Sequence, residues 1–534
     1  MPNGPPAQRQ TISMSRIETF ISDYGDKFTV TGLSSEDRAA LLGSISLALE
    51  PNSSTCDSQK IVTALSAIRI LSRDKLNIDR WFDEAIFCQL MRHSGLQHYR
   101  EEGRVVLLPD NVDMGIVTEA MKCLCNLTFN NNTVQSLCAK ERCVLSIIQR
   151  ARTYTDESIH PEVKFYDMRL MFLITALVKT VRTQAMLEWE AMPVLADILQ
   201  DMTSSTKDLS DSEADLAVEV LKAAYNLTLP ISPWDDEFFP LESSLTRLVS
   251  EIRNLLCHSW ATKEKHLEII KHSSNLFTTL PVFTAHFLIP CHDESAAAAV
   301  ARSFQGYDVS AIVEILRYLE VVLEDTTIAS QRDRVLPLVT ALTHLSRSDR
   351  IIRKYCRLRI LPHLRDEVKR LPEEGDSLRN RLCKLLTTPN TEVKQVVADL
   401  LYVVCKENVS RLIKYSGFGN AAGLLAQYGL MRGSKVTPTA DYSDDSDSET
   451  EEYKELEPDI NPVTGRYETG KTDPMAGMSE EQKEYEAMQL INAMDRLQRL
   501  GVVQPSTIGS DGKPVPVEHV LQLAQDPASD ENTD

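Results

Sequence analysis

Three serines in an acidic run of the chain could accept phosphate. Ser443, Ser446 and Ser448 lie in DYSDDSDSETEEYKELEPD, residues 441–459, which has ten acidic residues and one lysine. Ser446 and Ser448 each have a glutamate three residues on, and Ser443 has Ser446 at that position. This spacing suits an acidophilic kinase of the casein kinase 2 type, with Ser443 favoured once Ser446 is phosphorylated. The alternative is an unmodified, solubilising tail.

Basic residues earlier in the chain could receive such phosphates. A phosphate adds roughly −2 charge at neutral pH and pairs well with arginine. The candidate partners form two groups before the acidic run, namely Arg350, Arg353 and Lys354, and then Arg411 and Lys414. We therefore expect a phosphorylated tail to fold back on these two groups.

An asparagine recurs in similar apolar surroundings, as Asn126 in CLCNLTF, Asn226 in YNLTL and Asn275 in SNLFTTL. The first two fit the N-glycosylation pattern, but the N-terminus has no apolar signal-peptide region, so we interpret the match as accidental. An amide both donates and accepts hydrogen bonds, so it could hold the backbone of a bound segment. The alternative is an amide satisfied by a neighbouring carbonyl, but the recurrence favours a groove position.

Motifs for covalent chemistry are absent from the sequence. It contains no phosphate-binding GxxxxGK[ST], no HExxH, no GxSxG and no CxxC pair. Its eleven scattered cysteines are typical of the reduced, buried thiols of a cytosolic protein. The net charge of −20 argues against bulk nucleic-acid binding. We expect a binding protein with no metal or cofactor, rather than an enzyme.

The elements that position these residues are predicted to be helices. In IVTALSAIRILSRD the apolar residues keep to one helical face, and Arg69 and Arg73 are four apart and share a face. Similar segment endings at residues 70, 126, 176, 226, 275 and 344 are 56, 50, 50, 49 and 69 residues apart. A period near fifty predicts an all-α solenoid of the armadillo or HEAT kind. The longer last step indicates an inserted loop around residues 291–308.

The glycine content rises near Gly417: eleven of the twenty glycines follow residue 416, which indicates the end of the repeat array.

Ser479 and Gln482 have the spacing of a capping box and start an amphipathic helix. No apolar run reaches the roughly 18–20 residues that a membrane helix needs. We predict a flexible N-terminus (1–30), a repeat domain (31–430), an acidic phosphorylatable linker (431–478), an amphipathic partner-binding helix (479–500) and a disordered tail (501–534). The apolar face of the helix consists of Tyr485, Met488, Ile491 and Leu497.

Several stretches together resemble the synembryn family, the "resistance to inhibitors of cholinesterase 8" proteins. They occur in order from about residue 60 to 505, namely IRILSRD, MKCLCNL, FYDMRLMFLITAL, LPHLRDEV, LIKYSGFGNAAGLLA, and NPVTGRYE followed by MSEEQKEYEAM. The resemblance implies a chaperone for nascent heterotrimeric G-protein α subunits that is also a non-receptor guanine nucleotide exchange factor in receptor signalling. It also implies that the terminal helix of the α subunit lies in the solenoid trough.

The resemblance and the residue patterns together predict the site residues. The predicted partner contacts in the trough are Arg69, Arg73, Asn126, Asn131, Phe165, Phe172, Tyr225 and Asn226. The family's phosphorylated tail positions fall on Ser443 and Ser448. We expect a cytoplasmic monomer that its partner recruits to the cell cortex or plasma membrane.

An exchange factor of this kind need not touch the nucleotide. If it binds the nucleotide-free α subunit more tightly than the GDP-bound one, it weakens GDP binding by the same factor. The alternative function is an armadillo adaptor that binds linear peptides without any effect on nucleotide exchange.

Overall fold

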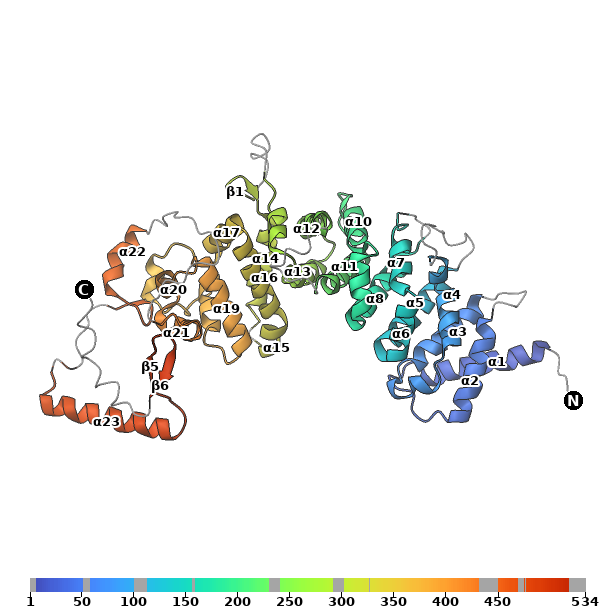
Figure 1. The fold of residues 1–534 in the computed structure, drawn as a ribbon, viewed down its shortest axis with the longest axis horizontal. Coiled ribbons are helices and arrows are strands. Elements are labelled where there is room, and N and C mark those ends of the chain that lie inside the picture. The colour runs from blue at the N-terminus through green and yellow to red at the C-terminus, as the bar shows by residue number, and fades with distance from the viewer. Residues whose placement is uncertain are drawn as a thin grey trace. The chain divides into compact units, whose positions relative to one another are not determined.

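A computed structural model describes residues 6–50, 58–99, 113–155, 159–229, 241–291, 302–325, 327–431, 450–468, 475 and 477–517 of the chain. The chain divides into two compact units, Met1–Leu288 (unit 1) and Ile289–Asp534 (unit 2). Both units are built mainly from helices, as Figure 1 shows. Apart from small hairpins, the described residues form a helical, armadillo-like repeat fold, and the predicted all-α fold class is confirmed.

Unit 1 is a series of short helices joined by tight turns. Local residues define many of the helix starts. Ser210 forms a capping box with Glu213 at one helix, and Pro161 occupies the first turn of another. The helices of unit 1 are α1 (Pro6–Tyr24), α2 (Ser35–Leu49), α3 (Ser58–Leu71), α4 (Glu84–His93), α5 (Met114–Asn130), α6 (Asn132–Lys140), α7 (Cys143–Ala151), α8 (Pro161–Leu177), α9 (Lys179–Leu187), α10 (Ala191–Thr203), α11 (Asp211–Thr228), α12 (Glu242–Cys257) and α13 (Lys263–Phe277). Short 3-10 segments are η1 (Lys75–Arg80), η2 (Leu96–Tyr99) and η4 (Val282–Leu288).

Five helices of unit 1 pack one on the next and are called here the ladder helices. Helix α3 packs on α5, α5 on α8, α8 on α11, and α11 on α13. A second set packs behind them, in which α10 contacts both α7 and α12. Each ladder helix therefore buries its apolar residues against the preceding and following repeats, which is how a solenoid obtains a continuous core.

The first residues of the chain differ from the prediction of a flexible segment. Helix α1 packs on α2 and α3, and its Ile17 and Phe20 are buried. Arg73 binds the loop that follows α1, because its Nη1 donates to the carbonyls of Gly25 and Lys27 over 2.9 and 2.6 Å. The packing of Ile17 and Phe20 and the hydrogen bonds of Arg73 therefore make α1 part of the helical array.

A buried ionic network lies between α7 and α8. Arg150 and Asp167 are both fully buried and form a bidentate ion pair. Arg150 also donates to the Ser94 carbonyl, and the Tyr154 hydroxyl donates to Asp167 over 2.9 Å. Burial raises the pKa of the Asp167 carboxyl, although Arg150 acts in the opposite direction. The network satisfies both charges, as burial requires.

Unit 2 has a helical core in which α19 packs on α16, α17 and α21. Its helices are α14 (Ser310–Val322), α15 (Ile328–Ser330), α16 (Leu336–Ser348), α17 (Arg350–Ile360), α18 (Leu378–Leu385), α19 (Thr391–Val404), α20 (Val409–Ser416), α21 (Phe418–Gln427), α22 (Glu451–Leu456) and α23 (Glu480–Arg499). Shorter turns are the π-helical η5 (Gln331–Val335) and the 3-10 segments η6 (Asp366–Lys369) and η7 (Glu457–Asp459).

Three small antiparallel hairpins complete unit 2. They are β1 (Ser303–Phe304) with β2 (Tyr307–Asp308), β3 (Ile460–Asn461) with β4 (Arg466–Tyr467), and β5 (Ser506–Ile508) with β6 (Pro514–Pro516). The first lies within the insertion expected around residues 291–308, of which residues 292–301 are outside the described part.

The C-terminal part of the chain differs from the predicted linker and tail. Residues 450–468 form α22, η7 and the β3–β4 hairpin, where a linker was expected to extend to residue 478. The β5–β6 hairpin lies within the stretch predicted to be a disordered tail. Both segments make backbone contacts with α21 or its ends, described below, and composition alone does not reveal such contacts.

Candidate functional site

A row of charged side chains crosses the ladder helices of unit 1. Arg69 of α3 donates from Nε to Glu119 Oε1 of α5 over 2.5 Å, and Ser66 donates to the same oxygen. Lys122, one turn after Glu119, lies 3.7 Å from the other carboxylate oxygen. The same Lys122 Nζ lies 5.4 Å from the ring centre of Tyr166 on α8. The carboxylate of Glu119 is buried, so these contacts fix the orientation of both cations.

A second copy of this arrangement joins α8 and α11. Arg169 donates to Glu219 Oε1 over 3.0 Å, and Lys222 donates to the same oxygen over 2.8 Å. Lys222 Nζ also lies 4.2 Å above the ring of Phe172. Glu219 is 3% exposed, which makes it a buried anion held between two partly exposed cations.

These six residues form what is called here the charged ladder: Arg69, Glu119, Lys122, Arg169, Glu219 and Lys222. Five of them were not among the predicted site residues, although a sequence feature identifies them. Each arginine precedes its glutamate by fifty residues, which is the repeat period. The buried carboxylates hold the guanidinium and ammonium groups in fixed positions beside aromatic rings. Such a surface suits a peptide segment that combines carbonyl or carboxylate acceptors with apolar side chains.

The predicted asparagines do not share one environment. Asn226 is 4% exposed, and its Nδ2 donates to the Phe172 carbonyl over 2.9 Å and to Thr175 Oγ1 over 3.2 Å. It therefore joins α11 to α8 inside the array, and the groove position expected for it is wrong. The neighbouring-carbonyl alternative describes it instead.

Asn131 and Asn126 differ from Asn226 and from each other. Asn131 is buried and caps α6, because its Oδ1 accepts from Val134 N over 3.0 Å while its Nδ2 donates to Asp79. It is a helix cap rather than an open contact residue. Asn126 is half-buried on α5, and among the described residues its side chain has no hydrogen-bond partner. Asn126 thus keeps its amide available, whereas the third asparagine, Asn275 of α13, is partly buried and its Oδ1 is buried without a hydrogen-bond partner among the described residues.

The predicted aromatic contacts are placed on neighbouring ladder helices. Phe165 and Phe172 of α8 and Tyr225 of α11 are all partly exposed. Phe165 packs edge-on against Tyr166, with ring centres 5.0 Å apart. Arg73, by contrast, is committed to the loop after α1, as described above, so its predicted partner contact would compete with a structural role.

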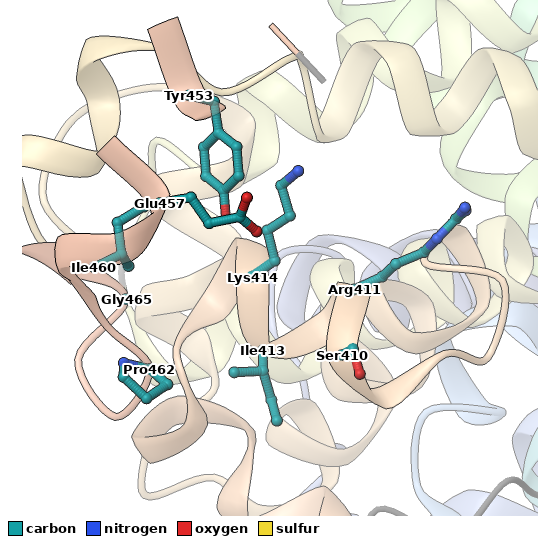
Figure 2. A pocket seen from close by; sticks show the side chains of 9 residues that line it. All are labelled: Ser410, Arg411, Ile413, Lys414, Tyr453, Glu457, Ile460, Pro462 and Gly465. Atoms are coloured by element: carbon teal, nitrogen blue, oxygen red, sulfur yellow. The ribbon is translucent and has the colours of Figure 1, made fainter. Parts of the chain in front are cut away.

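A pocket of about 310 Å³ lies on α20 of unit 2, at the end of the acidic run (Figure 2). Tyr453 of α22 points toward Lys414, whose Nζ lies 3.8 Å from the ring centre, while Arg411 extends away from both. Thr450 caps α22 and also donates from Oγ1 to the Leu364 carbonyl over 2.6 Å. The pocket is lined by Ser410, Arg411, Ile413, Lys414, Tyr453, Glu457, Ile460, Pro462 and Gly465.

The predicted phosphate-docking residues of α17 have different exposures. Arg350 is exposed and Lys354 is partly exposed. Arg353 is 5% exposed and donates from Nη1 to the Ser346 carbonyl over 3.0 Å, so its guanidinium is built into the core rather than presented to a tail. The three predicted phosphoserines, Ser443, Ser446 and Ser448, lie outside the described residues.

Helix α23 presents its apolar residues to solvent. Ser479 and Gln482 form the capping box, and no residue of the helix is buried. Tyr485, Met488 and Leu490 are each more than 60% exposed, while Leu497 is 37% exposed and Ile491 is partly covered. A helix with so large an exposed apolar surface is typical of a partner-binding element.

The described residues contain no cluster of three or more side chains suited to hold a metal ion. Ten described cysteines are free thiols, and seven of them are buried. Burial raises the pKa of the Cys356 and Cys383 thiols to about 12, which makes these two unreactive.

Within the described part of the chain, no single helix has both the length and the apolar character to cross a membrane. Helices α8 and α9 pass that test only as a pair, and the pair is bent by 118°.

Comparison with known proteins gives one family. The model of the guanine nucleotide exchange factor synembryn matches residues 64–513. The chain is 38% identical to "Chaperone Ric-8A" of Gallus gallus over 493 residues, covering 89% of this chain and 88% of that protein. It is 35% identical to "Chaperone Ric-8A" of Macaca fascicularis over 538 residues, covering 98% and 97%. A solved designed armadillo repeat protein in complex with a peptide matches 57% of this chain and 99% of its own, with 14% identity and a TM-score of 0.35.

Proposed function

The chain belongs to the family of the guanine nucleotide exchange factor synembryn, and on that basis we propose its function. It is a chaperone and exchange factor for heterotrimeric G-protein α subunits, and it performs no covalent chemistry. The observation that carries this conclusion is the family match over residues 64–513, which includes part of α3, the other four ladder helices, the α20 pocket and α23.

The exchange activity follows from linkage between two binding equilibria. A protein that grips the nucleotide-free α subunit more tightly than the GDP-bound form must weaken GDP binding by the same factor. The same preference holds an unfinished, nucleotide-free α subunit until GTP binds. Chaperoning and exchange are therefore two consequences of one difference in affinity.

The direct test is GDP release from a purified α subunit, with and without the full chain. Release should accelerate with increasing chain concentration and saturate. Tight binding of the α subunit with an unchanged GDP-release rate would contradict the exchange function and would indicate the adaptor alternative.

The charged ladder is the proposed binding face for the terminal helix of the α subunit. Arg69, the half-buried Asn126 and the partly exposed rings of Phe165, Phe172 and Tyr225 support this assignment. The guanidinium of Arg69 is already oriented by the buried Glu119, so little conformational entropy is lost when it accepts a partner.

The ladder assignment is tested with two matched arginine variants. Arg69→Ala removes the ion pair with the buried Glu119 on the ladder, and Arg152→Ala removes an exposed pair with Glu190 (2.9 Å) beside α7. We expect Arg69→Ala to weaken binding of a terminal-helix peptide roughly tenfold, the effect of about 1.4 kcal/mol, and Arg152→Ala to leave it unchanged. Equal affinities for both variants would contradict the assignment.

Helix α23 is proposed as a second contact with the α subunit. Its uncovered apolar face supports this role, because an isolated amphipathic helix of about 20 residues gains stability by docking.

Phosphorylation of the acidic run by a casein kinase 2-type kinase is proposed to hold this segment on unit 2. Thr450 is hydrogen-bonded to the Leu364 carbonyl, and Ser448 is two residues away, a reach of about 7 Å along an extended chain. Arg411 and Lys414 line the neighbouring pocket and supply positive charge. A phosphate on Ser448 could pair with them, and one on Ser443 with the exposed Arg350 and with Lys354.

Kinase-treated chain should therefore release GDP from the α subunit faster than an equally treated Ser443→Ala, Ser448→Ala variant. High salt should reduce the difference, because it screens exposed charges. Equal rates at low salt would contradict a phosphate switch.

We further propose that the chain acts as a cytoplasmic monomer that its partner recruits to the plasma membrane.

A further inference from the structure

We propose that the hairpins β3–β4 and β5–β6 anchor the chain before and after α23 on opposite ends of α21, so that α23 is tethered on both sides rather than on one. The residues that make these anchors are positioning residues for α23. The effect on exchange rests on the proposed function, whereas the anchoring itself does not.

The first anchor joins the turn of the β3–β4 hairpin to the start of α21. Phe418 N donates to the Pro462 carbonyl and Gly419 N to the Val463 carbonyl, both over 2.9 Å. A Cβ on Gly465 would lie 2.9 Å from Pro372 Cγ and 3.2 Å from Gly417 Cα. The two backbones therefore meet without room for a side chain, and the hairpin closes only with glycine at this point.

The second anchor joins the β5–β6 turn to the other end of α21. Met431 N donates to the Gly512 carbonyl over 3.3 Å. A Cβ on Gly512 would lie 1.9 Å from the Gly429 carbonyl oxygen, and one on Gly429 would lie 2.5 Å from the Asp511 carbonyl oxygen. Both glycines have positive φ, 72° and 69°. Figure 1 shows β5 and β6 between α21 and α23.

Helix α23 lies between these anchors in the sequence, and its own ends are well defined. The Ser479 capping box starts it, and after Leu500 the chain turns back through Gly501, with Val502 N donating to the Leu497 carbonyl over 3.0 Å. No residue of the helix is buried. The anchors therefore tether α23 through the chain on either side of it, residues 468–479 before the helix and residues 500–505 after it.

Tethering on both sides limits where the apolar face of α23 can reach. Releasing one end lengthens the effective tether and lowers the effective concentration of the helix at a second contact. A partner that needs both contacts therefore binds less tightly, whereas the affinity of a partner that touches only the ladder helices is unchanged.

The anchor itself is tested without any α subunit. In Gly512→Val the new side chain would clash with the backbone of Gly429. Gly477→Val is the matched control, because a Cβ on Gly477 meets no atom within 4 Å. Hydrogen exchange in the full chain should show faster exchange in residues 502–517 for Gly512→Val, with α1–α21 unchanged. Gly477→Val should match the parent chain. Unchanged protection in Gly512→Val would overturn the proposal.

A second variant, Gly465→Ala, tests the β3–β4 anchor independently of the Gly512→Val change in β5–β6. It should raise exchange in residues 450–468 and leave β5–β6 protected, because the two anchors are separate. Loss of protection throughout unit 2 in both variants would indicate core elements rather than anchors and would also overturn the proposal.

The functional consequence is measured by titrating an α subunit with each variant. Gly512→Val should raise the concentration needed for half-maximal GDP release roughly 3–10-fold, while the affinity for a terminal-helix peptide stays at the parent value. A parallel loss of peptide affinity would overturn the positioning role. If the parent chain itself fails to release GDP, the proposed function fails, and the hydrogen-exchange result still decides the anchor.

Discussion

The ladder helices of unit 1 and α23 of unit 2 start from similar amphipathic sequences and end in opposite environments. In the ladder, Glu219 is 3% exposed and Asn226 is 4% exposed, and both are bonded to the preceding repeat. In α23, no residue is buried, and its capping box and its Lys483–Glu480 and Arg499–Asp495 ion pairs join near neighbours in the sequence. A helix with neighbours on two sides uses even its polar groups for assembly, whereas α23, which has no buried residue, keeps its apolar face exposed for a partner.

The largest expected effect tests whether unit 1 depends on its internal polar groups. Arg150→Met leaves the buried Asp167 unpaired, which should lower the free energy of unfolding by about 3–5 kcal/mol. Arg152→Met, two residues on, removes an exposed pair and should cost about 0–1 kcal/mol. Tryptophan fluorescence in a urea titration reports on unit 1, because all four tryptophans lie between residues 81 and 260. Similar midpoints for the two variants would remove the distinction between buried and exposed charges.

The second prediction compares the two asparagines that occupy matching places in the repeat. Asn226→Ala removes two hydrogen bonds between α11 and α8, to the Phe172 carbonyl and to Thr175 Oγ1, and should cost about 1–3 kcal/mol. Asn126→Ala should change stability by less than about 0.5 kcal/mol, because the side chain is half-buried and unpaired among the described residues. The same urea titration measures both. Equal losses would show that the two positions are equivalent after all.

The third prediction concerns acid conditions and the last ladder helix. Burial, with Lys271 and Lys222 nearby, lowers the pKa of His272 on α13 to about 4, while Glu268 opposes this. The unfolded chain binds a proton near pH 6.5 and the folded chain does not, so stability falls as pH drops from about 6.5 toward 4.

Replacing the histidine isolates this contribution from other titrating groups. His272→Gln should remove about 1–3 kcal/mol of the pH dependence across this window, allowing for partial exposure. The difference between parent and variant midpoints at pH 7 and pH 5 measures it. A difference that is the same at both pH values would contradict a neutral, desolvated imidazole.

The smallest expected effect on stability belongs to α23. Replacing Met488 and Leu490 with serine should change the free energy of unfolding by less than about 0.5 kcal/mol, since both side chains are exposed. The same double variant should slow GDP release from the α subunit severalfold. Glu484→Gln, Glu486→Gln is a control for the helix with its apolar face intact. Stability loss comparable to that of Asn226→Ala would show that α23 is packed like a ladder helix.

Much of the architecture could be predicted from local patterns. The repeat period, the scarcity of glycine before residue 417 and the Ser479 capping box all correspond to elements of the structure. The predicted environment of single polar residues was less successful. Asn226 looks like Asn126 in the sequence, yet Asn226 bonds α8 and Asn126 stays unpaired among the described residues, because the Phe172 carbonyl that Asn226 binds lies 54 residues away in the chain.

The sequence by itself determined what depends on neighbours along the chain: helix periodicity, caps, the acidic serine run and the membership of a family. Tertiary structure alone decided which side chains already make hydrogen bonds within the fold. Arg353 became a core donor, Arg73 became a clamp on the loop after α1, and the NPVTGR turn became a backbone anchor for α21. The physical reason is that a hydrogen-bond donor or a glycine has no preference for a particular partner until packing brings one within about 3 Å.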